Sequence, residues 1–376
     1  MKNVKNGMIL VILMIYTFLN AAIIPAKAEI KNEAESTEAV ERVEFSGETE
    51  ALPALSEGVE VGSRILELFF GNKKNGEKKL IPGGEVFGVK IKQNHVSIAE
   101  SKGIPALSAG DIIISINGKS VSSAEDVRRA VAASGGESVT IRAKHNGADI
   151  GIEARPILCD GEYKLGLTLR DGAAGIGTIT FIDPETATFG GLGHGICDGD
   201  TGDIVDMQSG VVCEALLGGV HKGEVGKPGE LTGIIKDGEI GSLIANNECG
   251  VFGVLTEIPN DTDAIPIASK DEITEGEATI ISTIKNNKTQ EYKIEIYDID
   301  LSSSGSKSFR IRVTDETLKA LTGGIVRGMS GSPIIQDGKL VGAVTHVMVA
   351  DPTEGYGIFI ENMLNAAESQ VQPKAA

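Results

Sequence analysis

Ser330 is the residue in this chain best placed to act as a nucleophile. It lies in the loop Gly328-Met329-Ser330-Gly331-Ser332-Pro333. Acyl transfer by a serine needs a base within hydrogen-bond reach and donors aimed at the oxygen that becomes negative. Because glycine leaves the backbone uncovered, the amides of Gly328 and Ser330 can both point to one spot beside the hydroxyl group. The loop therefore predicts acyl-transfer chemistry at Ser330, although Gly, Ser and Pro also build ordinary turns and Ser332 is a second candidate.

A histidine is the expected general base, because its pKa lies near neutral pH. The chain has five. His194 is favoured because glycines flank it in Phe189-Gly-Gly-Leu-Gly-His-Gly-Ile196, so another loop can approach it closely. His346, in the strand that follows Ser330, is the alternative. The other three lie elsewhere, His95 and His145 in a separate compact unit and His221 in a loop rich in glycine and lysine.

Spacing alone does not identify the acid that would orient this base. The candidates are Asp183, Asp198, Asp200 and Asp315. Asp315 opens a short predicted helix that runs to Leu321 and stops at Gly323-Gly324. The residues by themselves therefore favour Asp315 as the N-cap of that helix.

Neither cofactors nor nucleic acid are expected. His194 and Cys197 suggest a metal pair, but no second closely spaced pair joins them, so no metal site is predicted. The Gly-x-Gly occurrences lack the strand-to-helix context that a nucleotide loop requires. The four cysteines show no Cys-x-x-Cys spacing and are expected to be buried free thiols, although an exported chain could pair them. The formal charge of -18 would repel phosphate backbones.

The elements that would position these residues are short strands. With 48 glycines and no tryptophan, the composition favours strands joined by tight turns, and hence a mainly β fold. Ile334 to Gln336, the turn at Asp337-Gly338 and Leu340 to Val347 predict a hairpin that mounts Ser330 rigidly. Similar apolar runs alternate with turns over residues 157–364, which predicts a sandwich or barrel. Residues 365–376 are expected to be a disordered tail.

The first 28 residues have the pattern of an export signal. Lys2 and Lys5 precede an apolar run from Met8 to Ile24, and Ala26-Lys27-Ala28 fits a small-residue cleavage site. The run is also long enough for an uncleaved membrane anchor. Residues 29–58 contain almost no large apolar side chain and predict a flexible acidic spacer. In either case the bulk of the chain is expected outside the cytoplasm.

Residues 80–156 form a separate unit. Asp111 leads into a strand from Ile112 to Ile116, Asn117-Gly118 makes a tight turn, and Ser122 with Glu125 forms a capping box for a helix ending at Ala133. This stretch closely resembles a PDZ domain, in which a peptide adds as a strand beside a helix and the amides of a Gly-containing loop hold its carboxylate. The resemblance implies that Val86-Phe87-Gly88-Val89 is that loop, with Phe87 lining an apolar pocket. Its ligand would be a peptide C-terminus or the chain's own spacer, and the alternative is a groove that is empty or filled internally.

The loop around Ser330 resembles the nucleophile loop of chymotrypsin-like peptidases. Longer segments resemble the SpoIVB sporulation peptidases over roughly residues 80–364, PDZ unit included: Gly191-Leu-Gly-His194, Val313-Thr-Asp315, Thr322-Gly-Gly-Ile-Val-Arg-Gly-Met-Ser-Gly-Ser-Pro-Ile334 and Gly342-Ala-Val-Thr-His-Val347. The resemblance implies a PDZ domain followed by a chymotrypsin-like β-barrel and a triad of His194, Asp315 and Ser330, with no cofactor. One departure is that Asp315 lies only fifteen residues before Ser330, whereas the acid of chymotrypsin-like peptidases lies far upstream.

The same resemblance implies a membrane-anchored regulatory protein as substrate, in the space between the mother-cell and forespore membranes. Its cleavage would release an intramembrane protease and then a late sigma factor. The long spacer also suggests self-cleavage, since an unstructured strand enters a cleft readily.

Two other functions remain open from the sequence. The chain is a PDZ-based adaptor if its β domain is an inactive peptidase scaffold that only binds a membrane partner. A quality-control protease of the HtrA kind is a weaker alternative, because PDZ units follow the catalytic domain in that group and precede it in this chain.

Overall fold

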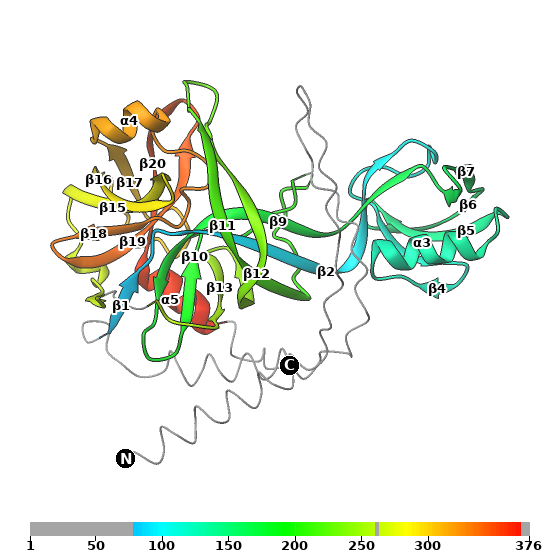
Figure 1. Cartoon of the computed structure of the whole chain (residues 1–376), viewed down its shortest axis with the longest axis horizontal. Helices are drawn as coiled ribbons and strands as arrows, with labels where there is room; N and C mark the ends of the chain where they lie inside the picture. The colour runs from blue at the N-terminus through cyan, green and yellow to red at the C-terminus, as the bar shows by residue number, and fades with distance from the viewer. Residues whose placement is uncertain (1–77, 200, 260–262, 370–376) are drawn as a thin grey trace, which may run out of the picture. The chain divides into compact units, whose positions relative to one another are not determined.

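Residues 78–199, 201–259 and 263–369 are described by the computed structural model shown in Figure 1. The fold is mainly β, as predicted, and consists of two β-barrels and a PDZ unit. The predicted export segment (1–28) and acidic spacer (29–58) lie outside the described residues. No helix in the described part of the chain is both long and apolar enough to span a bilayer.

Six antiparallel strands form the first barrel. They pair in the order β9 (Leu167–Ile182), β10 (Thr188–Gly191), β13 (Gly250–Leu255), β12 (Glu230–Asn247), β11 (Ser209–His221) and β2 (Val86–Ser101), and β2 pairs with β9 to close the ring. The short strand β1 (Lys79–Pro82) adds to β9, and β14 (Ile265–Pro266) adds to β1. A turn that begins at Asp183 joins β9 to β10, which brings His194 directly after a barrel strand.

The second barrel is also closed and six-stranded. Its order is β15 (Gly276–Lys285), β16 (Lys288–Tyr297), β17 (Phe309–Val313), β20 (Asp351–Phe359), β19 (Lys339–Met348) and β18 (Pro333–Gln336). A 3-10 turn spans Lys270–Glu272, and the helices are α4 (Glu316–Thr322) and α5 (Ile360–Ser369). The hairpin predicted behind Ser330 is confirmed as β18 and β19. The tail predicted from residue 365 is wrong as far as 369, because α5 continues there and buries Ala367.

The PDZ unit has a core of its own, built around Ile113, Val127 and Ile141. Besides the second half of β2 it contains β3 (Ile112–Ile116), β4 (Lys119–Ser120), α3 (Ala124–Ala133), β5 (Val139–His145) and β6 (Ala148–Ala154), followed by a hairpin of β7 (Ile157–Cys159) and β8 (Glu162–Lys164). The capping box of α3 uses Ser123 and Asp126, one residue later than predicted.

Strands β2 and β9 are each 16 residues long and contribute to both the first barrel and the PDZ unit. This corrects the predicted PDZ loop. Val86-Phe87-Gly88-Val89 lies in the barrel half of β2, where β11 pairs with one edge and β9 with the other. Phe87 is fully buried and packs edge-on against Phe189, with the ring centroids 5.8 Å apart. These residues have no edge free to receive a peptide. The predicted unit boundary at residue 80 falls in β1, which pairs with β9 of the first barrel.

The position beside the PDZ half of β2 is taken by β9. Leu167–Arg170 pairs with Ser97–Ser101, and Leu167 and Leu169 pack on the PDZ core. Asp171 accepts a hydrogen bond from the backbone amide of Ala124 at the start of α3, at 2.9 Å. The start of β9 therefore runs beside α3.

All four cysteines are free thiols. Cys213 and Cys249 are buried, as predicted, and burial raises the pKa of both. Cys159 and Cys197 are exposed, which the prediction of buried thiols missed.

Candidate active site

The loop that carries Ser330 is held by strands of both barrels. From the first barrel, the amide of Thr178 on β9 donates to the carbonyl of Ser330 at 3.1 Å. From the second, the carbonyl of Val344 on β19 accepts from the amide of Gly331 at 2.8 Å. The half-buried Ser330 hydroxyl donates to the carbonyl oxygen of Thr345 at 2.7 Å. Ser330 is thus mounted where the two barrels meet.

Gly331 is required by this close approach. Its φ is +96°, and a Cβ at this position would lie 2.1 Å from the carbonyl oxygen of Thr178 and 2.5 Å from the amide nitrogen of Leu192. Leu192 itself has a φ of +66°. The turn through Leu192 and Gly193 therefore places the segment carrying His194 directly against the nucleophile loop.

His194 and His346 lie together beside this loop. Their ring centroids are 5.0 Å apart, with the planes tilted by 38°. Nδ1 of His194 lies 2.9 Å from the carbonyl oxygen of Gly195. Because a carbonyl can only accept, Nδ1 must carry the proton, which leaves Nε2 of the neutral ring free to take one. The carbonyl of Gly195 thereby fixes the tautomer that a general base requires.

Both imidazoles are held in the neutral form. Burial lowers the pKa of His194, an effect that its bond to Gly195 partly opposes. Burial, together with the neighbouring His194 and Lys307, lowers the pKa of His346 to about 4. Nδ1 of His346 is buried and has no hydrogen-bond partner among the described residues. Two adjacent rings that are both neutral near pH 7 suit a site that must accept a proton.

The amides predicted for the oxyanion hole are available. Within the described chain, neither Gly328 nor Ser330 donates its amide to another protein group. The carbonyls that precede these amides are fixed: that of Arg327 accepts from Leu231 at 2.8 Å, and that of Met329 accepts from Ser332 at 2.9 Å. In a trans peptide the N–H points opposite to the C=O, so these bonds hold the two amides in set directions.

Ser332 is not positioned as a nucleophile. Its side chain is fully buried, and its hydroxyl donates to that of Ser282 at 3.0 Å. Of the two serines in the loop, the structure therefore favours Ser330.

Asp315 is the N-cap of α4. One of its carboxylate oxygens accepts from the amide of Leu318 at 2.9 Å, and the other from the amide of Lys293 at 3.3 Å. This confirms the helix-cap interpretation. Asp315 makes no hydrogen bond or ion pair with His194 in the part of the chain described, so the structure does not bring the three residues of the predicted triad together.

The remaining candidate acids and histidines that the structure describes make other contacts. Asp183 is buried 3.7 Å from Lys78, Asp198 pairs with Arg170 at 3.0 Å, and Asp200 lies outside the described residues. His145 pairs with Asp111, His221 pairs with Glu230, and His95 contacts Asn94. Among the described residues, Asp183, His95, His145 and His221 make no hydrogen bond or ion pair with Ser330 or His194.

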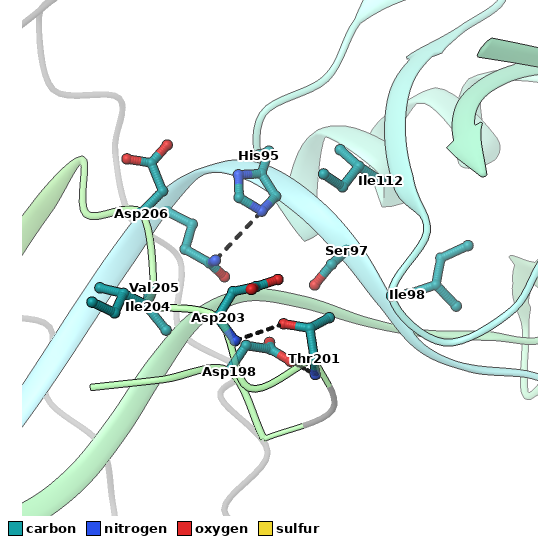
Figure 2. A pocket seen from close by; sticks show the side chains of 12 residues that line it. His95, Ser97, Ile98, Ile112, Asp198, Thr201, Asp203, Ile204, Val205 and Asp206 are labelled. Carbon is teal, nitrogen blue, oxygen red and sulfur yellow. Dashed lines mark hydrogen bonds between the residues drawn. The ribbon is translucent and has the colours of Figure 1, made fainter. Parts of the chain in front are cut away.

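A cavity of about 240 Å³ lies beside the PDZ half of β2 (Figure 2). Its lining includes His95, Ser97, Asp198, Thr201, Asp203 and Asp206. Asp198 is one of the candidate acids, but neither Ser330 nor His194 lines the cavity. Across the described ranges, no group of three His, Cys, Asp or Glu side chains is placed to hold a metal ion.

Sequence reasoning missed Thr178, Thr345 and Gly195. Each acts through a hydrogen bond across the fold or through its own carbonyl, and only Thr345 stood within a segment that the resemblance singled out. No local pattern marks a strand threonine as the support of a distant loop.

The arrangement can be compared with known proteins. The model of the SpoIVB peptidase S55 family matches residues 161–364, and that of a PDZ domain matches residues 97–144. A search of curated proteins finds no significant match.

Three solved structures show local likeness. The PDZ domain of the SdrC-like protein from Listeria monocytogenes is 25% identical, with a TM-score of 0.20, over 22% of this chain and 93% of its own. The active form of the Rv3671c protease from M. tuberculosis is 12% identical, with a TM-score of 0.33, over 54% of this chain and 78% of its own. The HtrA-type protease AlgW with a tripeptide is 13% identical, with a TM-score of 0.33, over 53% of this chain and 56% of its own.

The family match spans more than half of the chain and includes His194 and the loop from Gly328 to Pro333. PDZ unit and peptidase domain follow each other in the order that the sequence indicated. This chain belongs to the SpoIVB peptidase S55 family and is a serine endopeptidase that contains a PDZ domain.

Proposed function

We propose that Ser330 cleaves peptide bonds with His194 as general base. Rotation of the Ser330 side chain away from the carbonyl of Thr345 lets Oγ attack the substrate carbonyl carbon. A C–O bond forms, the hydroxyl proton moves to Nε2 of His194, and the amides of Gly328 and Ser330 bind the oxyanion. The C–N bond then breaks as His194 returns the proton to the leaving amine, and water hydrolyses the acyl-enzyme by the same steps in reverse.

The observation that carries this proposal is the pairing of a neutral, correctly oriented His194 with two unused amides beside Ser330. The orienting role that a carboxylate has in other serine peptidases is assigned to the carbonyl of Gly195. Asp315 remains the acid implied by family resemblance, and its contacts support a role in capping α4.

Labelling with a fluorophosphonate tests the nucleophile. We expect wild-type protein and Ser332→Ala to be labelled, and Ser330→Ala to be unlabelled and unable to cleave casein or itself. Cleavage retained by Ser330→Ala would overturn the assignment of Ser330. Normal partner function in a Ser330→Ala protein would favour the adaptor alternative, in which the β domain only binds its partner.

The substrate that we propose is a membrane-anchored regulatory protein outside the cytoplasm, cut to start a sporulation signalling cascade that activates a late sigma factor. Family membership and the export pattern of residues 1–28 support this proposal. Self-cleavage within residues 29–58 is proposed on the same basis. Mass spectrometry of the purified protein beside its Ser330→Ala form measures signal removal and self-cleavage together, and identical N-termini in both would exclude self-cleavage there.

The PDZ unit is proposed to bind a peptide between the start of β9 and α3. Leu167–Leu169 pairs only with β2 among the described residues, so its other edge can accept a strand beside the helix. The ligand is a peptide C-terminus or the chain's own spacer. Titration of wild-type protein and Ser330→Ala with labelled spacer peptide, followed by fluorescence anisotropy, tests this; protection of β9 amides from hydrogen exchange would locate the peptide.

A further inference from the structure

Two threonines on β9 donate side-chain hydrogen bonds to the nucleophile loop. Thr178 Oγ1 donates to the carbonyl of Gly328, and Thr180 Oγ1 donates to the carbonyl of Gly331, each at 2.8 Å. Residues two apart on a strand share a face, so both hydroxyls point the same way. Both threonines are fully buried. The two bonds lie on either side of Ser330 in the sequence of the loop.

The bond from Thr178 reaches the peptide unit between the two oxyanion amides. The carbonyl of Gly328 and the amide of Met329 form this unit, and the amides of Gly328 and Ser330 flank it. Met329 donates its amide to the carbonyl of Val326 at 3.1 Å, so the unit is held at both its donor and its acceptor. If this peptide rotates, the directions of its neighbours change with it, because the three units share their Cα atoms. The convergence of the two amides therefore depends on the orientation of the Gly328 carbonyl as well as on the bonds that hold the carbonyls of Arg327 and Met329.

Glycine makes this restraint necessary. Gly328 has a φ of +93°, and glycine reaches such values and their alternatives with little difference in energy. The backbone by itself does not select the conformation in which both amides point to one spot. Thr178 also donates its own amide to the carbonyl of Ser330, which places a second restraint from the same residue on the far side of the nucleophile.

We infer that Thr178 is a positioning residue for the oxyanion hole: its hydroxyl holds the Gly328 peptide so that the amides of Gly328 and Ser330 converge. This inference rests on the proposed function of Ser330. Thr178 does not touch the substrate, and it acts through the loop alone. Its loss should therefore lower the rate of the chemical step and leave substrate binding nearly unchanged.

The test replaces the hydroxyl without changing the shape of the side chain. Thr178→Val removes the donor and keeps the branched form, whereas Thr178→Ser keeps the donor. Thr188→Val is the matched control, because Thr188 is equally buried in the same barrel. Among the described residues its hydroxyl bonds only to that of Thr186, at 2.8 Å, and neither hydroxyl bonds to the loop of Ser330. Steady-state kinetics on a peptide substrate, the rate of fluorophosphonate labelling and the melting temperature are measured for each.

We expect Thr178→Val to lower kcat by about ten- to hundred-fold, somewhat less than the loss of a complete oxyanion donor, with KM changed by less than about three-fold. Labelling should slow in parallel, because the phosphonyl oxygen uses the same amides. Thr178→Ser should recover most of the rate, and Thr188→Val should keep the wild-type kcat even where its melting temperature falls.

If Thr178→Val keeps the wild-type kcat and its melting temperature falls as in Thr188→Val, the inference is overturned. Thr178 would then have a structural role only. Ser330→Ala separates this result from failure of the proposed function. If Ser330→Ala still cleaves, the proposed function itself is wrong. If Ser330→Ala is inactive while Thr178→Val is fully active, only the inference about Thr178 fails. If Thr178→Val unfolds, the inference is tested by the kcat of Thr178→Ser and by the labelling rate of the fraction of Thr178→Val that remains folded.

Discussion

The imidazole of His346 lies against that of His194, with the ring centroids 5.0 Å apart. His194 has its Nδ1 satisfied by Gly195, whereas the buried Nδ1 of His346 has no partner among the described residues. The first ring is therefore oriented as a base, and the second packs beside it.

This difference predicts which histidine is the base. We expect His194→Gln to lower kcat/KM by about 10²–10⁴-fold, the range for loss of a general base. His346→Phe keeps a flat ring against His194 and should lower kcat/KM by less than about ten-fold. Casein or peptide cleavage measured at one pH compares the two. The opposite order of losses would assign the base to His346.

The acid limb of activity follows from the burial of His194. Its pKa is lowered, so the neutral form persists to lower pH than for an ordinary histidine. We expect kcat/KM to stay level from pH 8 down to the ordinary histidine value of about 6.5 and to fall only below it. A profile of kcat/KM against pH measures this. A midpoint above 6.5 would contradict the site as described.

Stability should depend on pH in the same direction. The pKa of His346 is about 4 in the fold, below its unfolded value, so the unfolded chain binds more protons between these two values. The contribution of His346 to the free energy of unfolding is therefore complete above about pH 6.5, and it is lost as the pH falls towards 4. Urea unfolding at pH 7.5 and pH 5 measures the decrease. We expect the difference in free energy of unfolding between these two pH values to become smaller in His346→Phe. It should stay the same in His221→Gln, which changes an exposed position.

Asp315 offers a test that separates a helix cap from a catalytic acid. Asp315→Ala should lower the free energy of unfolding by about 1 kcal/mol, because α4 loses the acceptor for the amide of Leu318. Asparagine caps helices about as well as aspartate, so Asp315→Asn should keep both the stability and most of the activity. Chemical denaturation and peptide cleavage are measured on both variants. An Asp315→Asn protein that is stable but inactive would instead support the carboxylate of Asp315 as the acid of the triad.

Replacing Gly331 and Gly338 in turn gives a matched test of the close approach of the two barrels. Both have positive φ, +96° and +74°, but a Cβ at Gly331 meets Thr178 and Leu192, whereas a Cβ at Gly338 meets nothing within 4 Å. Gly338→Ala should lose only about 1–2 kcal/mol from the strained backbone. Gly331→Ala should lose more than about 4 kcal/mol, since backbone atoms must move, and should be inactive. Equal losses in denaturation would show that no close contact exists at Gly331.

Phe87 distinguishes the structure from the sequence prediction for the PDZ loop. As a fully buried side chain of the first barrel, it should lose about 3–5 kcal/mol of stability on replacement by alanine. Peptidase activity should fall with the folded fraction, as followed by thermal unfolding. A Phe87→Ala protein with unchanged stability and lost peptide binding would support the original loop instead.

Much of the site was readable from sequence because it depends on local patterns. The turn residues Asp337-Gly338 and the apolar runs beside them defined β18 and β19, and the glycines around His194 and Ser330 marked backbones that must approach something closely. The capping role of Asp315 was also visible, since an acid before a short helix is a local signal.

The predictions that were wrong or incomplete concern features that depend on pairing between distant segments. The residues Val86-Phe87-Gly88-Val89 have the composition of a PDZ loop, but β2 continues straight through them because β11 and β9, more than 80 residues further along the chain, pair with its two edges. The support of the Gly328 carbonyl by Thr178 spans 150 residues and has no local signature. The position of Asp315 relative to His194 likewise depends on how the two barrels meet.

The strands β2 and β9 limit the modularity of this protein. A chain cut at residue 96 to release the peptidase would remove Phe87, Val89 and Ile91 from the first barrel and expose the edge of β11. A PDZ fragment ending at residue 156 would lose the leucines of β9 that pack on its core. We therefore expect the pair, joined by two strands that each belong to both, to unfold as one.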